Sequence, residues 1–194
     1  DLNAIAEESF TYDTHGNRTL SNGENATFDN QDRITAMGDR SYTFDDDGAL
    51  NTRTDSSGTE TFSYSMRGTL LSASSGSYNI KYSHDAFGRL IKRESETNTT
   101  EYFYMNPDQG YQLTAFRVGT DDLVELIYDG NNHLVSLTQG SDTYYVATDH
   151  LGTPRAVFDD TSSLVKEISY TAFGVIVSDS NPGFLLPVGF VGGL

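Results

Sequence analysis

A short turn motif that recurs along the chain constrains its fold more than any other feature. An aromatic residue and Asp come first, and Gly stands three residues after the Asp, as in Tyr12-Asp13-Thr14-His15-Gly16 and Phe44-Asp45-Asp46-Asp47-Gly48. The Asp carboxylate accepts hydrogen bonds from the backbone of its own turn. Gly adopts the positive φ that closes a type I turn with a bulge. Each copy of the motif therefore predicts one β-hairpin.

Further copies are incomplete but keep the spacing of the motif. Some retain two or three of its key residues, namely Tyr64 with Gly68, Asp85 with Gly88, Asp149 with Gly152, Tyr170 with Gly174, and Tyr128-Asp129 followed by Asn132. Asn and Asp replace Gly in some copies because they tolerate the left-handed conformation better than other residues do. The glycine-equivalent positions are 16, 32, 48, 68, 88, 108, 132, 152 and 174, in steps of 16 to 24 residues. Such spacing indicates a repeat protein.

The segments that flank the turns alternate polar and apolar side chains. Ser41–Phe44, Thr61–Tyr64 and Tyr78–Tyr82 follow this period of two, which predicts strands with one face inward and one outward. No segment keeps a helical period over three turns, and Leu2–Glu8 would form one short helical turn at most. The expected fold class is all-β. Consecutive antiparallel β-hairpins would pair edge to edge into a coiled, twisted sheet or partial shell, because β-sheets twist.

Composition excludes several classes of partner. The net charge of −16 argues against nucleic acid and against an anionic membrane surface, and no apolar run is long enough for membrane insertion. Cysteine is absent, so neither disulfides nor thiolate metal sites form. We expect a lead-in over 1–9, hairpin repeats over 10–181 and an apolar C-terminal segment over 182–194. The start Asp1-Leu2-Asn3-Ala4 is typical of a processed or excised piece of a longer chain.

One stretch resembles a known family closely. Tyr145-Val146-Ala147-Thr148-Asp149-His150-Leu151-Gly152-Thr153-Pro154-Arg155-Ala156-Val157 is similar to the core segment of the RHS or YD-repeat family, and Tyr170–Gly174 and Gly189–Leu194 extend the resemblance. This family includes bacterial RHS and toxin-complex shell proteins and animal teneurins. The resemblance implies the C-terminal part of a repeat core that coils into a hollow shell, which encloses a toxin in bacterial members and is an adhesion scaffold in teneurins. Some members cleave themselves with aspartates downstream of this stretch, and no residue here matches that motif.

The remaining candidates for chemistry are better explained as parts of turns. His15, His84, His133 and His150 lie in or beside separate turns, where convergence on a zinc ion is not expected. Asp45-Asp46-Asp47-Gly48 suggests calcium, but the spacing of a calcium-binding loop is not met. We therefore expect no enzyme, no catalytic residue, no cofactor and no metal. The residues with an expected structural role in the turns are Tyr12, Asp13, Gly16, Phe44, Asp45, Gly48, Tyr64, Gly68, Asp85, Gly88, Tyr128, Asp129, Asp149, Gly152, Tyr170 and Gly174.

The C-terminal segment 182–194 is unusually apolar and carries no charged side chain. It either plugs the core of the repeats or is a strand donated to a neighbouring copy, since open sheet edges promote such pairing. The candidate assembly residues are Phe184, Leu185, Leu186, Val188, Phe190, Val191 and Leu194.

Two functions follow from these features. The first is a non-catalytic structural piece of an extracellular β-shell or scaffold that encapsulates or presents a partner. The alternative is a self-assembling surface fibre subunit or adhesin that polymerises through open sheet edges and the C-terminal segment. Expected partners are other copies of the chain, neighbouring shell segments, or a protein or glycan at the cell surface. The expected location is secreted or at the cell surface, in a bacterial source.

Overall fold

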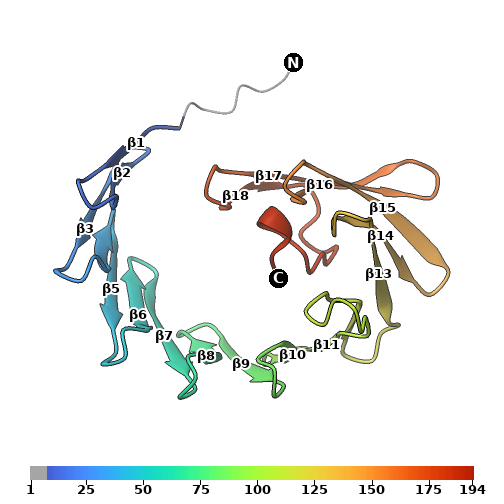
Figure 1. The fold of residues 1–194 in the computed structure, drawn as a ribbon, viewed down its shortest axis with the longest axis horizontal. Helices are drawn as coiled ribbons and strands as arrows, with labels where there is room; N and C mark the ends of the chain where they lie inside the picture. The colour runs from blue at the N-terminus through green and yellow to red at the C-terminus, as the bar shows by residue number, and fades with distance from the viewer. Residues whose placement is uncertain (1–7) are drawn as a thin grey trace. The chain divides into compact units, whose positions relative to one another are not determined.

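The protein, seen here in a computed structural model that describes residues 8–194, is built of short β-strands (Figure 1). Contacts divide it into two compact units. Unit 1 holds the described residues up to Gly88 together with Arg93–Thr97, and unit 2 holds Arg89–Lys92 together with Asn98–Leu194. Strand β10 (Leu90–Glu94) falls at their boundary. This boundary lies inside the expected repeat region 10–181.

Unit 1 is a run of hairpins in which each strand pairs with the next one along the chain. All of these pairs are antiparallel. The strands are β1 (Phe10–Tyr12), β2 (Arg18–Ser21), β3 (Glu24–Phe28), β4 (Ile34–Met37), β5 (Arg40–Phe44), β6 (Leu50–Asp55), β7 (Gly58–Tyr64), β8 (Leu70–Ser74) and β9 (Asn79–His84).

Unit 2 continues the same scheme of antiparallel neighbours. Its strands after β10 are β11 (Thr99–Phe103), β12 (Ala115–Val118), β13 (Val124–Tyr128), β14 (Leu134–Gln139), β15 (Asp142–Thr148), β16 (Pro154–Asp159), β17 (Leu164–Tyr170) and β18 (Ile176–Asp179). A single turn of 3-10 helix, η1 (Phe190–Gly192), lies in the C-terminal segment.

A β-bulge beside the repeated turn sets the register of most of these hairpins. Phe44 lies opposite Leu50 and Tyr64 lies opposite Leu70, with the register shift immediately before each aromatic residue. The bulge accommodates the extra residue of the turn, so the aromatic and aliphatic side chains face the same side of the sheet. On the opposite side, hydroxyl groups pair across the strands, as in Thr43 with Thr52 at 2.6 Å.

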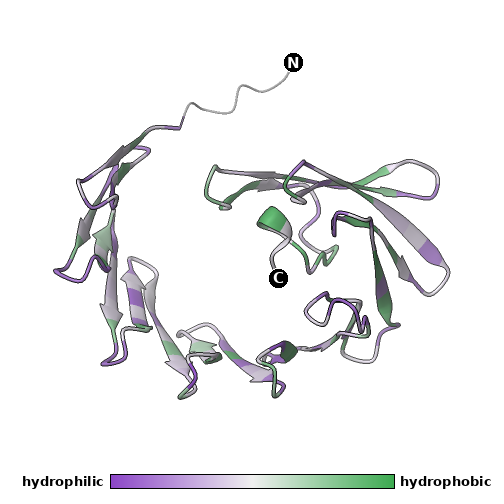
Figure 2. Cartoon of the chain, in the orientation of Figure 1, coloured by the Kyte–Doolittle hydropathy of each residue, from purple (hydrophilic) through white to green (hydrophobic). Residues whose placement is uncertain are grey.

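The apolar core lies mainly in unit 2 (Figure 2). Phe116, Leu134, Leu137 and Val157 are fully buried there. Among the described residues of unit 1, Ala73 is the only apolar residue that is buried, and the aromatic side chains of that unit are half-buried or exposed. The stability of unit 1 therefore depends more on the hydrogen bonds between its strands and between its polar side chains than on a closed apolar core.

The predicted fold class is confirmed, because the described chain consists of consecutive antiparallel hairpins with strands where the alternating pattern placed them. Ser41–Phe44 lies within β5 and Thr61–Tyr64 within β7. The helical turn expected over Leu2–Glu8 and the lead-in over 1–9 fall outside the described residues except for their last one or two positions.

Candidate functional site: the turn edge and the C-terminal segment

Most of the Asp turns are held by the same set of hydrogen bonds, of which Asp149 is an example. Its backbone N–H donates to the Thr153 carbonyl at 2.9 Å, and the Gly152 N–H donates to the Asp149 carbonyl at 3.0 Å. The Asp149 Oδ1 atom accepts from the N–H groups of Leu151 at 2.9 Å and Thr153 at 3.1 Å. The same carboxylate pattern recurs at Asp13, Asp29, Asp45, Asp129 and Asp159.

The expected glycine positions adopt the left-handed conformation with one exception. Positive φ occurs at Gly16, Asp32, Gly48, Gly68, Gly88, Asn132, Gly152 and Gly174. Asp108 does not adopt it and lies in a loop between β11 and β12, so the spacing argument was wrong at this position.

One Asp turn escaped the sequence analysis. Asp159 begins a turn in which Ser162 has a φ of 65° and donates its N–H to the Asp159 carbonyl at 3.0 Å. The signal was present in Phe158-Asp159-Asp160-Thr161-Ser162, which has the aromatic residue and the Asp at the usual spacing. Ser stands in the glycine position, and Ser is a poor predictor of positive φ.

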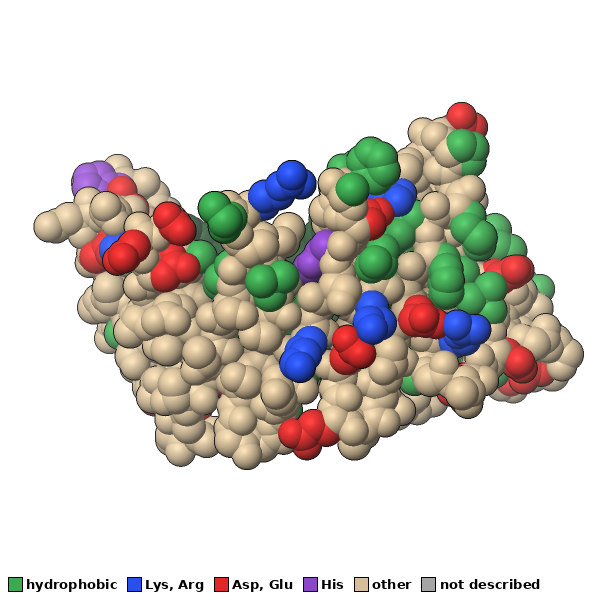
Figure 3. Space-filling model, turned by 90° about the horizontal axis from the view of Figure 1, so that it is seen from below, with side chains coloured by type: hydrophobic (Ala, Val, Ile, Leu, Met, Phe, Trp, Pro, Cys, Tyr) green, Lys and Arg blue, Asp and Glu red, His purple; other side chains and the backbone are tan. Residues whose placement is uncertain are grey.

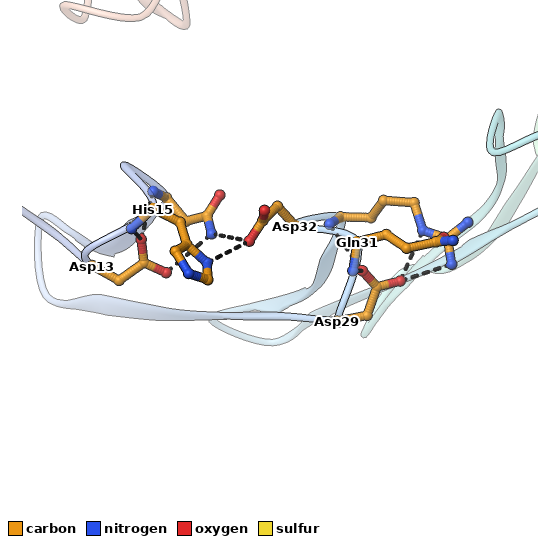
Figure 4. A network of polar contacts seen from close by, with 7 residues as sticks. Asp13, His15, Asp29, Gln31 and Asp32 are labelled. Atoms are coloured by element: carbon orange, nitrogen blue, oxygen red, sulfur yellow. Dashed lines mark hydrogen bonds and ion pairs between the residues drawn. The ribbon is translucent and has the colours of Figure 1, made fainter.

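Side chains also join one turn to the next (Figure 4). The Asp32 Oδ1 atom accepts a hydrogen bond from Asn17 Nδ2 at 2.8 Å and lies 3.1 Å from His15 Nδ1. Asn17 Nδ2 also donates to Asp13 Oδ2 at 3.0 Å, so it bridges the first two turns. In unit 2, Gln112 Nε2 donates to Asn132 Oδ1 at 2.5 Å and forms a similar tie.

Two arginines that follow turns, Arg33 and Arg155, lie over aromatic rings of the following repeat. The guanidinium carbon of Arg33 is 5.0 Å from the ring centre of Phe44, and that of Arg155 is 5.5 Å from the ring centre of Tyr170. Arg155 also donates from Nη2 to Asp149 Oδ2 at 2.8 Å. Cation–π contacts of this kind add about 0.5–1 kcal/mol each at exposed sites. The turn edge is thus a chain of contacts from repeat to repeat.

These hydrogen bonds lower the pKa of the carboxyl groups of Asp29, Asp129 and Asp159. The main cause is the backbone N–H of Arg33 at Asp29 and that of His133 at Asp129. At Asp159 the hydroxyl of Thr161 lowers the pKa most, followed by the N–H of Ser163. The carboxylates therefore stay ionised as turn acceptors, and a general acid near neutral pH would need the opposite shift.

The C-terminal segment 182–194 contacts the core of its own unit and contains no strand. Val188 is 4% exposed and belongs to the core cluster, against which Phe184 and Leu186 also pack. The ring centre of Phe184 is 4.9 Å from that of Tyr144 in an edge-on contact. Leu185, Val191 and Leu194 are about half exposed or more, at 48%, 50% and 61%.

A buried lysine holds the beginning of this segment. Lys166 on β17 is 4% exposed, and its Nζ atom donates to Asp179 Oδ2 at 2.7 Å and to the carbonyls of Asn181 at 2.7 Å and Phe184 at 3.2 Å. The three ammonium protons match the three acceptors. Sequence analysis missed Lys166, because its surroundings come from residues 13 to 18 positions later.

The end of the segment lies on two turns. The backbone N–H of Val191 donates to Thr153 Oγ1 at 2.9 Å, and Thr153 is completely buried. The ring centres of Phe190 and Tyr170 are 5.8 Å apart. A Cβ atom placed on Gly174 would be 2.7 Å from Phe190 Cδ1. Glycine is therefore required at position 174 for two reasons: the turn needs a positive φ there, and Phe190 leaves no room for a Cβ atom.

The described residues form no group of three or more His, Cys, Asp or Glu side chains that could hold a metal ion. Burial raises the pKa of Tyr128 to about 12, so this hydroxyl remains protonated at neutral pH.

On the face drawn in Figure 3, basic side chains are interspersed with acidic ones and form no continuous basic field. None of the helical residues in the described part forms a span that could cross a membrane.

Comparison with known proteins agrees with this architecture. Residues 2–194 match the family described as Teneurin YD-shell. The chain belongs to this family. It is 35% identical over 196 residues to Teneurin-4 of Homo sapiens and 37% identical over 197 residues to Teneurin-3 of Danio rerio. Each alignment covers 95% of this chain but only 7% of the relative. Membership in the YD-repeat family, expected from the motif, is thereby confirmed.

Among solved structures, the YD-shell chain is similar to one described as the crystal structure of TcdB2-TccC3. The TM-score is 0.48 with 15% identity, and the match covers 95% of this chain and 11% of that one. The expected bacterial source is not supported, because the matched curated relatives include teneurins of Homo sapiens, Danio rerio and Drosophila melanogaster.

Proposed function

We propose that this chain is a non-catalytic wall segment of an extracellular or cell-surface YD-shell, which encloses or presents a partner. The observation that carries the proposal is the use of its polar side chains. Asp149 is engaged by two backbone N–H groups and by Arg155, and Asp32 is engaged by the preceding turn. Polar side chains whose hydrogen bonds are made within the chain itself favour a rigid structural role over catalysis.

The C-terminal segment acts in this proposal as a plug for unit 2. Val188 enters the core, Lys166 binds the start of the segment, and Thr153 binds its end. The segment covers apolar side chains that a single curved layer of strands would otherwise expose, and such burial stabilises by about 25 cal/mol per Å². A plug of this kind keeps the last repeats in a fixed register.

Site-specific cross-linking in the full-length protein tests whether the wall holds a partner. A photo-reactive phenylalanine analogue replaces Phe62 on the half-buried face of β7 or Ser63 on the opposite, exposed face. Enclosure predicts cross-links from position 62 to another segment or partner, whereas presentation predicts them from position 63. Absence of cross-links from both positions would contradict the proposal.

A self-assembling fibre is the second candidate, and the last strand favours it. Val175, Ile176 and Val177 in and before β18 are 65%, 54% and 61% exposed, which is unusual for three successive aliphatic residues. Such an exposed strand can pair with another copy. Light scattering with size-exclusion chromatography and negative-stain microscopy separates the two functions. A monomer supports the wall segment, and filaments that Val177→Lys abolishes support the fibre.

A further inference from the structure

Unit 2 exposes large apolar side chains on the face of its sheet opposite the core. Ile127 on β13, Tyr145 on β15 and Leu164 on β17 are 50%, 53% and 55% exposed. Leu126 and Val146, which adjoin two of them in the chain, belong to the core cluster. Because successive side chains of a strand point to opposite faces, the exposed residues lie on the side away from the core. We call this side the open face of unit 2.

The strand register makes these exposed residues neighbours. Ser136 lies opposite both Ile127 and Tyr145. Phe158 lies opposite both Tyr145 and Leu164. Directly opposed side chains share a face at the spacing of adjacent strands, so these five residues form one row about 19 Å long. Ser136 is only 8% exposed, which is consistent with cover by the larger side chains on either side. We call these five residues the apolar row.

A continuous row differs from scattered exposed apolar residues. Single aliphatic or aromatic side chains are common on protein surfaces, whereas contiguous ones mark interaction sites. In unit 1 the corresponding face carries paired hydroxyls such as those of Thr43 and Thr52. The hairpin fold therefore does not itself require apolar side chains on this face.

Carboxylates flank the apolar row on both sides. Glu125 stands two residues before Ile127 on β13 and is exposed. Glu167 on β17 is also exposed and lies opposite Ala156, which stands two residues before Phe158 on β16. Because β13 and β16 run in opposite directions, the two glutamates fall on opposite sides of the row.

Within the described strands β13 to β17, no basic side chain lies on the open face. Their only basic residues are Arg155 and Lys166. Arg155 binds Asp149 at a turn, and Lys166 is buried by the C-terminal segment. Arg117 on the adjacent strand β12 is paired with Glu101. The open face therefore combines a row of apolar side chains with a net negative charge.

This charge selects the kind of partner that fits the face. A second copy would bring the same glutamates against each other, and each chain has a net charge of −16, so repulsion opposes face-to-face pairing. A partner that carries Lys or Arg beside an apolar strip gains burial of the row and attraction to both glutamates.

We propose that the open face of unit 2 docks a positively charged polypeptide segment of another protein. Its apolar side chains pack on the apolar row, and its Lys or Arg side chains meet Glu125 and Glu167. This inference rests on the proposed wall function, because it gives the partner of a presenting wall a face and a chemistry. Cross-linking at positions 62 and 63 tests the wall function in unit 1, whereas titration of the open face concerns unit 2 alone, so either can fail without the other.

Amide NMR of the isotope-labelled chain tests the proposal with a helical peptide of Leu and Lys that has one apolar and one basic face. We expect this peptide to shift the amide signals of Ile127, Ser136 and Tyr145 with a Kd of about 10–100 μM. Two peptides of the same length are the controls. Replacing every Leu by Ala keeps the helix and the charge but removes the apolar bulk, and replacing every Lys by Glu reverses the charge. Each control should bind at least about tenfold more weakly.

Variants of the chain locate the binding. Ile127→Ser combined with Tyr145→Ser should weaken binding of the Leu–Lys peptide at least about tenfold, because it removes half of the large side chains of the row. Tyr12→Ser is the matched control, because Tyr12 is 55% exposed but lies in unit 1. Glu125→Gln combined with Glu167→Gln should make the binding less sensitive to salt, because screening then has fewer charges to act on.

Four results would overturn the proposal. The first is that the Leu–Lys peptide shifts none of these signals at ~1 mM, far above the expected Kd. The second is that the Ala–Lys peptide binds as tightly, which would leave charge alone as the cause. The third is that the Ile127→Ser and Tyr145→Ser double variant, with the wild-type dispersion of its other amide signals, binds as well as the wild type. The fourth is that the same signals shift when the chain alone is concentrated, which would assign the face to a second copy.

Discussion

Replacing Lys166 by Met tests whether the buried ammonium holds the C-terminal segment in place. Met keeps most of the length and apolar surface of the lysine stem but removes the charge and all three donors. The Asp179 carboxylate and the carbonyls of Asn181 and Phe184 would then lose their common partner. Because the lysine is 4% exposed, water cannot replace it without the segment moving.

The size of the effect follows from this burial. Removing one partner of a buried ion pair costs about 3–5 kcal/mol, because it leaves the other charge uncompensated. Asp179 is 18% exposed, so partial access to water places the expected loss near the lower end. A loss of ~3 kcal/mol corresponds to a change of about 100-fold in the equilibrium for opening the segment.

Hydrogen exchange measures this opening directly. The amide of Val191 is a suitable reporter, because it donates to Thr153 and lies 25 positions from Lys166 in the sequence. We expect its exchange to accelerate about 100-fold in Lys166→Met. The amide of Gly48, which closes a turn in unit 1, should not change.

Two further variants complete this test. Lys81→Met removes an exposed lysine from β9 and should leave the exchange of Val191 as it is. Lys166→Met combined with Asp179→Asn removes the uncompensated carboxylate and should recover part of the loss. An acceleration of less than about threefold in Lys166→Met, equal to ~0.7 kcal/mol, would refute the reasoning.

Three other predictions concern the turns. Gly174→Ala should destabilise unit 2 by about 1–3 kcal/mol more than Gly68→Ala destabilises unit 1 in urea unfolding, because both have positive φ but only Gly174 touches Phe190; equal losses would contradict the packing role of Gly174. Asp149→Ala should cost about 1–3 kcal/mol by the same measurement, because two backbone N–H groups and Arg155 lose their acceptor, while Asp160→Ala at an exposed position should be neutral. Acid should also destabilise the chain, because the pKa values of Asp29 and Asp129 are lower in the folded state than in the unfolded state. The stability that these two groups contribute is present above the unfolded pKa near 3.8 and is lost as the pH falls through their folded pKa values. A stability that is constant or rising from pH 5 to pH 3, followed by circular dichroism in urea, would contradict this assignment.

Much of the fold could be predicted because the decisive chemistry is local. Asp149, Gly152 and Thr153 form their turn within five residues, so a sequence window contains every partner. Local reasoning failed at Asp108, where spacing alone was used, and at Ser162, where the conformation is one that Ser rarely adopts.

The candidate sites show where such reasoning ends. The apolar character of 182–194 was visible in the sequence, but its docking depends on Lys166 and on Thr153, 38 positions before Val191. No period or spacing predicts this docking, since it depends on side chains that are far apart in the sequence and meet only in the folded chain.

The sequence by itself determined the repeating hairpin, because a carboxylate and a left-handed residue three positions apart close a turn without help from the rest of the chain. Only the tertiary structure decided which side chains are buried. A lysine on β17 is buried only because the chain returns over it with three acceptors, and Gly174 is needed twice only because Phe190 comes to rest against it. Burial and close approach depend on how distant segments pack together, and in unit 2 these interactions give the series of hairpins a covered core.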